Sequence, residues 1–414
     1  MNTLTQSNIK GNNKIYCWLL ALIYFIPNIN YYISFIMYGL GVANTTTVSL
    51  YIAVYLVVIF AYIKSMFKSL LPFGCLLLIF FLYVTTLAFW PQNQQYMFGD
   101  LWDAVYNPLY RIVFLGVPLF YLPSLIDDSE YLYNVFCKFA WVNLFIGVLA
   151  FFWQVLGAQH DFEYMTFSYN ILFSSCLCFV EARRKGSLVL TVFSVVGLVS
   201  AFVIGSRGSM LSVLLFAFLY AVMNVNNVSP FKLLFSRAIL AFVAIFVLSS
   251  FNDILSATID VFDSIGFESR TFEKILEDTV FEDSSRSEII NVVTESIWKS
   301  PIFGNGLFGD RHAIALSGRA ATYTHNILLE LLCHFGVLVG GILCILYIYY
   351  SIKTLFTKQG NKWDLLYLCA FCTAFLKLMV TGSYLGEQTF FLLIGCIFAI
   401  KRSKAHKSNG GNGL

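Results

Sequence analysis

Long apolar runs, separated by short polar segments, fill most of this chain. Many have the length, roughly 17–25 residues, that an α-helix needs to cross a bilayer, whereas barrel strands would give alternating segments of about ten residues. The pattern predicts an all-α polytopic membrane protein with about twelve transmembrane helices. Pro27 interrupts the first run and predicts a kink or a break there. The expected spans lie at 15–38, 47–63, 69–90, 105–123, 133–156, 167–182, 187–205, 209–225, 236–251, 327–350, 364–381 and 388–400.

One long polar segment, from about 251 to 324, interrupts the succession of apolar runs. Part of it is amphipathic, with apolar residues at helical spacing at Ile289, Ile290, Val293, Ile297 and Trp298. The residues that follow predict that this helix ends in turns, namely Pro301, Gly304, Gly306 and Gly309. We therefore expect a folded helical loop that caps the outer membrane–water interface.

The composition agrees with a membrane protein and indicates neither a nucleic-acid-binding protein nor a redox or zinc motif. The chain of 414 residues is 58% hydrophobic and 12% charged, against about 25% charged residues in a soluble domain. The net charge of +3 does not indicate a nucleic-acid partner, because the charges are segregated by loop. Cys369 and Cys372 have the spacing of a redox or zinc motif, but they lie in an apolar run without a second pair, which favours packing.

Basic residues orient the expected helices. They cluster before the first span and after the second, sixth, eighth, tenth and last spans, as in cytoplasmic loops. The first span lacks a cleavage site and is expected to remain a helix. We therefore expect both termini in the cytoplasm, about nine helices in 1–250, the outer loop in 251–325, about three helices in 326–402 and a tail in 403–414. The residues are Lys10, Lys14, Lys64, Lys68, Arg183, Arg184, Lys185, Lys232, Arg237, Lys353, Lys358, Lys362, Lys401, Arg402, Lys404 and Lys407.

Five basic residues fall in the outer half of the membrane or just above it, where a charge is costly and usually faces a cavity. They are Arg111, Arg207, Arg286, His325 and Lys377. Each has a plainer interpretation. Arg111 and Arg207 could anchor at the interface, and Arg286 could pair with Glu282 or Asp283. His325 could donate to a backbone carbonyl at a helix start, and Lys377 could reach the interface or pair with Glu387.

Arginines at a membrane face suit a diphosphate whose lipid tail lies in the bilayer. A guanidinium binds two phosphate oxygens at once and stabilises the charge on a departing diphosphate. A histidine with a pKa near the working pH can act as a general base. The sequence shows no cluster with metal-ligand spacing, no nucleotide-binding glycine loop and no nucleophile elbow.

Three motifs occur in a fixed order around the outer loop. The first runs from Gly205 to Leu211 around Arg207, and the second joins Ser285-Arg286-Ser287-Glu288 to a Pro-x-x-Gly-x-Gly pattern at 301–306. The third is His325-Asn326, followed by Glu330, Gly336 and Gly340. In these motifs the chain resembles the O-antigen ligase and polymerase superfamily of bacterial envelope glycosyltransferases.

The resemblance implies a GT-C-type fold in the bacterial inner membrane, with one large periplasmic loop over the active site. It implies an inverting, metal-independent transfer from an undecaprenyl-diphosphate-linked oligosaccharide, with no cofactor. By motif, the catalytic residues are Arg207, Arg286 and His325. Arg207, Arg286, Asn326 and Glu330, together with Lys377 and Arg111, are expected to bind the diphosphate or glycan. A chain-length regulator protein is a further expected partner.

The motifs leave open which glycan transfer takes place. A polymerase extends the glycan on a fresh lipid-linked repeat unit, whereas a ligase moves the finished glycan to lipid A–core. We favour the polymerase. The chain is rich in aromatic residues, with 42 Phe and 24 Tyr, and its apolar spans have an idiosyncratic sequence, as in polymerases adapted to one repeat unit. A lipid-linked oligosaccharide flippase or transporter, and a non-catalytic envelope assembly protein, are the alternatives from other classes.

Overall fold

The computed structural model describes residues 3–41, 56, 58–67, 69–98, 107–155, 164–203, 207–223, 286–318, 323–357 and 360–410. These residues form helices and turns, with no β-strand among them. Seven of the described helices are long and apolar enough to cross a membrane, and Leu188–Phe202 and Gly208–Met223 are shorter apolar helices. The described part of the chain is thus all-helical, and its long apolar helices indicate a multi-pass membrane protein. The predicted span 236–251 and most of 47–63 lie outside the described residues, so the count of about twelve spans stays a prediction.

Four helices form an aromatic-rich bundle in the N-terminal half. Helix α1 (Thr3–Gly39) packs on α7 (Ser129–Val155), which also contacts α8 (Tyr164–Lys185), and α8 packs on α9 (Leu188–Val203). Tyr24 and Phe25 of α1 pack against Phe136 of α7 and Phe173 of α8, mostly in edge-to-face or tilted pairs. The helix α1 continues through Pro27, so the first span is not split there.

The predicted span 105–123 corresponds to one helix, Pro108–Leu125, whose backbone hydrogen-bonding pattern changes along its length. It consists of α5 (Pro108–Tyr110), the π-helix η2 (Arg111–Gly116), α6 (Val117–Tyr121) and the 3-10 helix η3 (Leu122–Leu125). Pro118 and Pro123, at the starts of α6 and η3, cannot donate backbone hydrogen bonds, which favours such changes of pattern. These pieces pack on α18 (Gln388–Gly410), while α3 (Leu71–Phe89) exposes most of its apolar side chains at the periphery.

The C-terminal helices complete the core. Helix α17 (Lys362–Val380) packs against α10 (Arg207–Met223), α18 and α16 (Ile327–Phe356). Helix α16 kinks at Gly336, whose φ of 75° is not helical. All ten cysteines of the chain are described and unpaired, and Cys369 and Cys372 are buried in α17, as expected for packing residues.

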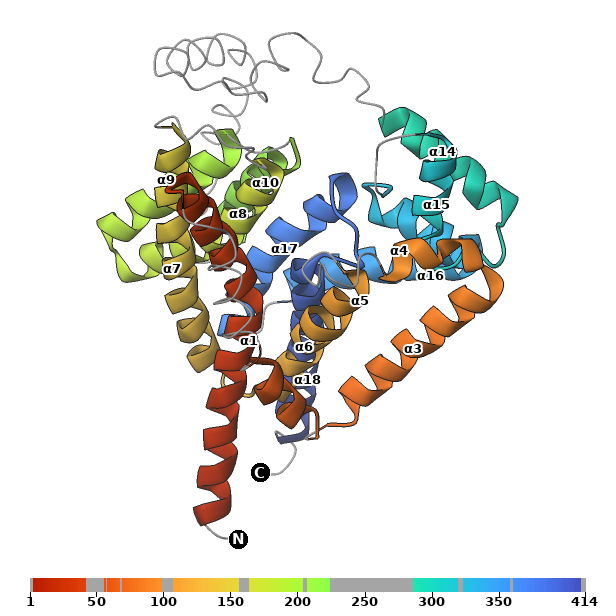
Figure 1. Ribbon diagram of the computed structural model, residues 1–414. Coiled ribbons are helices and arrows are strands. Elements are labelled where there is room, and N and C mark those ends of the chain that lie inside the picture. The colour runs from red at the N-terminus through yellow and green to blue at the C-terminus, as the bar shows by residue number, and fades with distance from the viewer. Residues whose placement is uncertain are drawn as a thin grey trace.

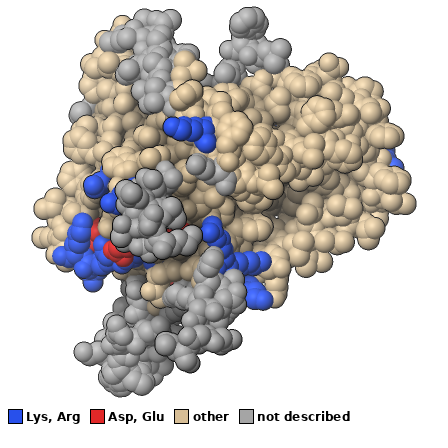
Figure 2. Space-filling model, turned by 90° about the horizontal axis from the view of Figure 1, so that it is seen from below, with Lys and Arg blue, Asp and Glu red and all other residues tan. Residues whose placement is uncertain are grey.

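One end of the molecule is basic. Both termini lie at this end (Figure 1), and the view from below shows Lys and Arg side chains gathered there (Figure 2). Arg184 bonds Glu130 and Glu181, and Lys362 pairs with Glu130. These ion pairs join the start of α7, the end of α8 and the start of α17. Basic residues from loops that are distant in the sequence therefore meet at one end, as the expected topology requires.

A helical cap packs on α16 near the opposite end of the molecule (Figure 1). It contains α14 (Arg286–Lys299) and α15 (Gly309–Leu316), joined by turns. Ile289, Val293 and Ile297 of α14 are buried against Ile314 and Cys333. The expected amphipathic helix and the turns after it are therefore confirmed, although Ile290 and Trp298 face outward. The remainder of the predicted loop, 251–285 and 319–322, lies outside the described residues.

Candidate functional site

Thr381, at the end of α17, is the point where two of the sequence motifs meet. Gly208, the second residue of α10, lies so close to Tyr169 and Thr381 that a Cβ there would overlap the tyrosine hydroxyl. The Nδ1 atom of His325 lies 3.0 Å from the carbonyl oxygen of Thr381. Arg207 is the first residue of α10. The start of α10 and the residue two positions before α16 thus approach the same short link between α17 and α18.

His325 is held by a backbone hydrogen bond. Because a carbonyl can only accept, the Nδ1 atom carries the proton in this contact, and a neutral imidazole then has its lone pair on Nε2. Burial lowers the pKa of His325 below its ordinary value of 6.5, and the bond to Thr381 offsets part of this effect. The contact is the one that the plainer interpretation anticipated, and it also prepares Nε2 to accept a proton.

Arg286 begins α14 and is half-buried. Its positive charge lies close enough to His325 to lower the pKa of the imidazole further, whereas Asp310 acts in the opposite direction. Arg286 of the second motif is therefore close enough to His325 of the third motif for its charge to affect the imidazole. The alternative partners of Arg286, Glu282 and Asp283, lie outside the described residues.

Lys377 and Arg111 meet around Glu387, just before α18. The Lys377 ammonium lies 2.5 Å from the Glu387 carboxylate and 4.7 Å from the centre of the Tyr169 ring. Burial alone would raise the pKa of Glu387, but the charges of Lys377 and Arg111 hold it below its usual range. Lys377 therefore forms the ion pair that the plainer interpretation named. Through Tyr169, which also contacts Gly208, the pair adjoins the start of α10.

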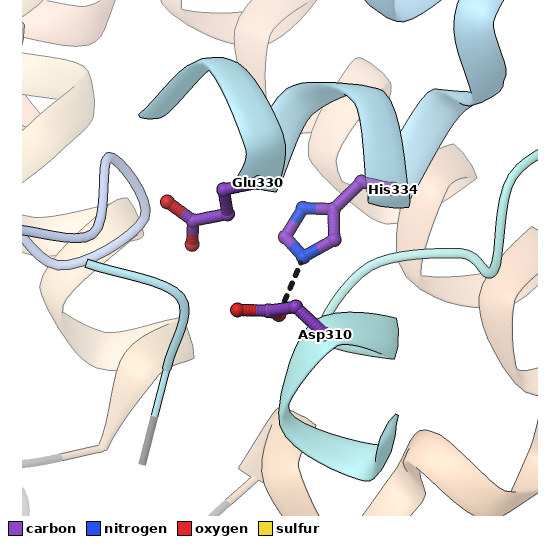
Figure 3. A group of neighbouring side chains, drawn as sticks. All are labelled: Asp310, Glu330 and His334. Atoms are coloured by element: carbon purple, nitrogen blue, oxygen red, sulfur yellow. Dashed lines mark hydrogen bonds and ion pairs between the residues drawn. The ribbon is translucent and has the colours of Figure 1, made fainter. Parts of the chain in front are cut away.

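Asp310, Glu330 and His334 form a buried polar cluster on the inner side of the cap (Figure 3). The Nε2 atom of His334 lies 2.9 Å from Oδ1 of Asp310, and its Nδ1 atom lies 2.9 Å from the Tyr384 hydroxyl. The sequence analysis assigned no role to His334 or to Asp310. The available signal was the spacing of four residues between Glu330 and His334, which places both on one face of α16.

This cluster could hold a metal ion by distance alone, since one ligand atom from each residue lies within 4.8 Å of the others. Those atoms already have protein partners. Asp310 Oδ2 accepts from Thr324, and the two oxygens of Glu330 accept from Ser383 and from the Tyr384 backbone. Each carboxylate oxygen of the two acids and both ring nitrogens of His334 therefore have a protein partner, and together these groups form a hydrogen-bonded network.

The remaining residues of the third motif have clear structural positions. The Asn326 side chain caps α16 by accepting from the backbone N–H groups of Leu328 and Leu329. Glu330 is 1% exposed, with both carboxylate oxygens bonded inside the protein. The substrate-binding role of Asn326 stays a prediction. Glu330, by contrast, faces the link between α17 and α18, which the sequence could not reveal.

Comparison with known proteins identifies the segment that carries these motifs. Residues 191–345 match the family model described as O-Antigen ligase. In this segment the chain is similar to the O-antigen ligase family, which agrees with the resemblance carried by the motifs. It runs from α9 into α16 and includes Arg207, Arg286 and His325. The family consists of glycosyltransferase-like enzymes of O-antigen biosynthesis, and the match supports an enzyme of this general kind without separating polymerase from ligase. No curated protein and no solved structure matches the chain.

Proposed function

We propose that this protein is an O-antigen polymerase of the bacterial inner membrane, with its active site facing the periplasm. It would transfer a growing glycan from undecaprenyl diphosphate to a lipid-linked repeat unit. The observation that carries the proposal is the family segment, whose motif residues at 208 and 325 approach the same Thr381. The ligase is the competing assignment, because the matching family model is described by that name.

The donor diphosphate would bind near the starts of α10 and α14. Arg207 and Arg286 are the first residues of these helices. A helix start presents unpaired backbone N–H groups and a partial positive charge, so a phosphate there gains from the helix as well as from the guanidinium. The same groups would stabilise the negative charge that grows on the diphosphate as it leaves.

His325 would act on the acceptor sugar. In an inverting transfer, the acceptor hydroxyl oxygen forms a bond to the anomeric carbon while the bond from that carbon to the diphosphate breaks. The hydroxyl proton would pass to Nε2 of His325, whose lone pair the Thr381 contact leaves available. An orienting role, in which His325 accepts a hydrogen bond from the hydroxyl without taking its proton, uses the same geometry.

Lys377 and Arg111 would extend the diphosphate site. With Glu387 they form a group of two cations and one anion, which keeps a net positive charge beside Tyr169 and the start of α10. A chain-length regulator protein remains an expected partner. The chemistry proposed for the described residues requires neither a metal ion nor a cofactor.

The test begins with the lipopolysaccharide of a deletion strain. Loss of a polymerase leaves core carrying a single repeat unit, whereas loss of a ligase leaves bare core. Bare core in the deletion strain would overturn the polymerase assignment in favour of the ligase. Unchanged long-chain banding would contradict both.

Complementation with variants then tests the residues. Arg207→Ala and Arg286→Ala should each lower transfer by about 100- to 1000-fold, the usual effect of removing one group that stabilises developing charge. Arg-to-Lys variants should also transfer poorly, because lysine cannot bind two oxygens in a fixed plane. Arg183→Ala, an exposed arginine at the basic end, is the matched control and should keep normal banding. Normal banding from either site variant would show that the diphosphate assignment is wrong.

A further inference from the structure

His325 has a backbone conformation that few residues adopt. Its φ is 57°, in the left-handed region, and Phe308 is the only other described non-glycine residue with a positive φ. This region costs roughly 1–2 kcal/mol for an ordinary residue and persists only where the surroundings fix it. The conformation of His325 therefore requires that the residues on both sides of it are held in place.

The residues on the two sides are Thr324 and Asn326. Thr324 is 3% exposed, and its backbone N–H and its hydroxyl donate to Oδ2 of Asp310 at 3.1 and 2.7 Å. Asn326 is tied to α16 by its capping hydrogen bonds. With both neighbours fixed, the chain between them has little freedom, and the histidine turns toward Thr381.

Asp310 is itself held in place by His334. The second carboxylate oxygen of Asp310 accepts from Nε2 of His334 (Figure 3). The Tyr384 hydroxyl lies within hydrogen-bonding distance of the other ring nitrogen. Burial alone would raise the pKa of Asp310, but the interactions with His334, Arg311 and Thr324 together lower it below the ordinary value. Asp310 is thus a fully ionised acceptor for Thr324 at neutral pH, and charge-assisted bonds of this kind are among the stronger ones.

Glu330 fixes the other side of the histidine. Its carboxylate accepts from the Ser383 hydroxyl and the Tyr384 backbone N–H, in the link that begins with Thr381. That link supplies the carbonyl oxygen that receives the Nδ1 proton of His325. One buried cluster therefore fixes both the backbone of His325 and the hydrogen-bond partner of its ring.

We propose that the Asp310–His334–Glu330 cluster is a positioning device, with Asp310 acting through Thr324 to hold His325 in its functional orientation. The proposal rests on the function proposed above for His325 and adds residues that act through it. Asp310 belongs to the cap, whereas His334 and Glu330 belong to α16. His325 is therefore ordered only when the cap is packed on α16.

The sharpest variant is Thr324→Val, which keeps the side-chain shape and removes the hydroxyl that bonds Asp310. With purified protein and an undecaprenyl-diphosphate-linked repeat unit, it should lower kcat by about 10- to 100-fold at similar KM, as misplaced catalytic groups do. Thr324→Ser should restore turnover. Thr373→Val is the matched control, because Thr373 is equally buried at 3% exposed and bonds a backbone carbonyl in the middle of α17.

A second readout does not depend on turnover. Deuterium exchange at the C2 carbon of the His325 ring, followed by mass spectrometry across pH, reports the pKa of that imidazole and its access to water. Among the described residues, Arg286 and Asp310 are the charged groups that shift the pKa of His325. The parental midpoint should lie below 6.5, and Thr324→Val should move it upward because the ring becomes more solvated. Thr373→Val should leave it unchanged.

The outcomes separate this proposal from the polymerase assignment. If Thr324→Val keeps both the parental midpoint and the parental kcat, the positioning role is wrong. If the parental protein transfers no glycan while the midpoint still moves in Thr324→Val, the assigned reaction fails and the positioning role stands. Should Thr324→Val fail to fold, Tyr384→Phe removes the hydroxyl at His334 Nδ1 and should move the midpoint in the same direction, and an unmoved midpoint there contradicts the proposal.

Discussion

At the residue scale, one hydrogen bond determines which ring nitrogen of His325 carries the proton. Donation from Nδ1 to the Thr381 carbonyl leaves Nε2 as the basic atom. Burial keeps the ring neutral at lower pH than usual. Both effects favour a base over a permanent cation at this position.

The residue-scale prediction concerns pH. A protonated imidazole cannot accept the hydroxyl proton, so kcat/KM should fall as pH drops through the pKa of His325. Because burial lowers that pKa, the midpoint of the acid limb should lie below the ordinary 6.5. His312→Gln, which replaces a histidine elsewhere in the cap, should keep the same profile. A midpoint at or above 6.5, or near-normal polymer length and yield from His325→Ala, would exclude the base.

At the element scale, the kink of α16 explains the glycines of the second motif. The kink at Gly336 frees backbone groups, and the turn after α14 bonds them: Asn305 N–H donates to Cys333 at 2.7 Å and Gly306 N–H to His334 at 3.1 Å. Val337 N–H donates in return to Pro301 at 2.7 Å. A Cβ on Gly304 or Gly336 would overlap this backbone. The Pro-x-x-Gly-x-Gly pattern therefore joins the cap to α16.

The element-scale prediction compares two glycines of that helix. Gly336→Ala places a methyl group against the Ile302 and Pro301 carbonyls at a positive φ, and backbone cannot move aside cheaply. It should destabilise the cap by about 1–3 kcal/mol, seen as a lower midpoint of thermal unfolding and faster proteolysis after α14. Gly341→Ala meets nothing within 4 Å and should be neutral or stabilising by about 0.5–1 kcal/mol. Equal effects from the two variants would count against the docking role of Gly336.

At the scale of the whole molecule, antiparallel helices separate a basic end from an end that carries the candidate site. Ion pairs among α7, α8 and α17 lie at the basic end, and the starts of α10 and α16 meet the end of α17 at the other. The alternation of helix directions thus gathers distant motifs at one end of the molecule.

The whole-molecule prediction is a labelling pattern. Leu316, in the cap, is 76% exposed, and Phe356, near the basic end, is 68% exposed. In right-side-out membrane vesicles, a membrane-impermeant maleimide should label Leu316→Cys and should reach Phe356→Cys only after permeabilisation. The parental protein is the background control, since nine of its ten cysteines are buried. Labelling in the opposite order would invert the proposed orientation.

The sequence by itself determined what depends on local pattern. Apolar runs require helices in a bilayer because the backbone must bond within each segment, and helical spacing revealed α14. Charge and motif order singled out Arg207, Arg286 and His325, which lie in the matched family segment.

Only the tertiary structure decided which side chains meet. The partnership of Lys377 and Arg111 around Glu387, and that of Asp310 with His334 and Thr324, join different elements through distances of a few ångströms. The carboxylate of Glu330, whose substrate-binding role stays a prediction, accepts hydrogen bonds from Ser383 and Tyr384. The physical reason is that periodicity reports which face of a helix is apolar. The kink at Gly336 and the left-handed turn at His325 set where each polar group points, and these depend on the packing of the cap, α16 and α17 together.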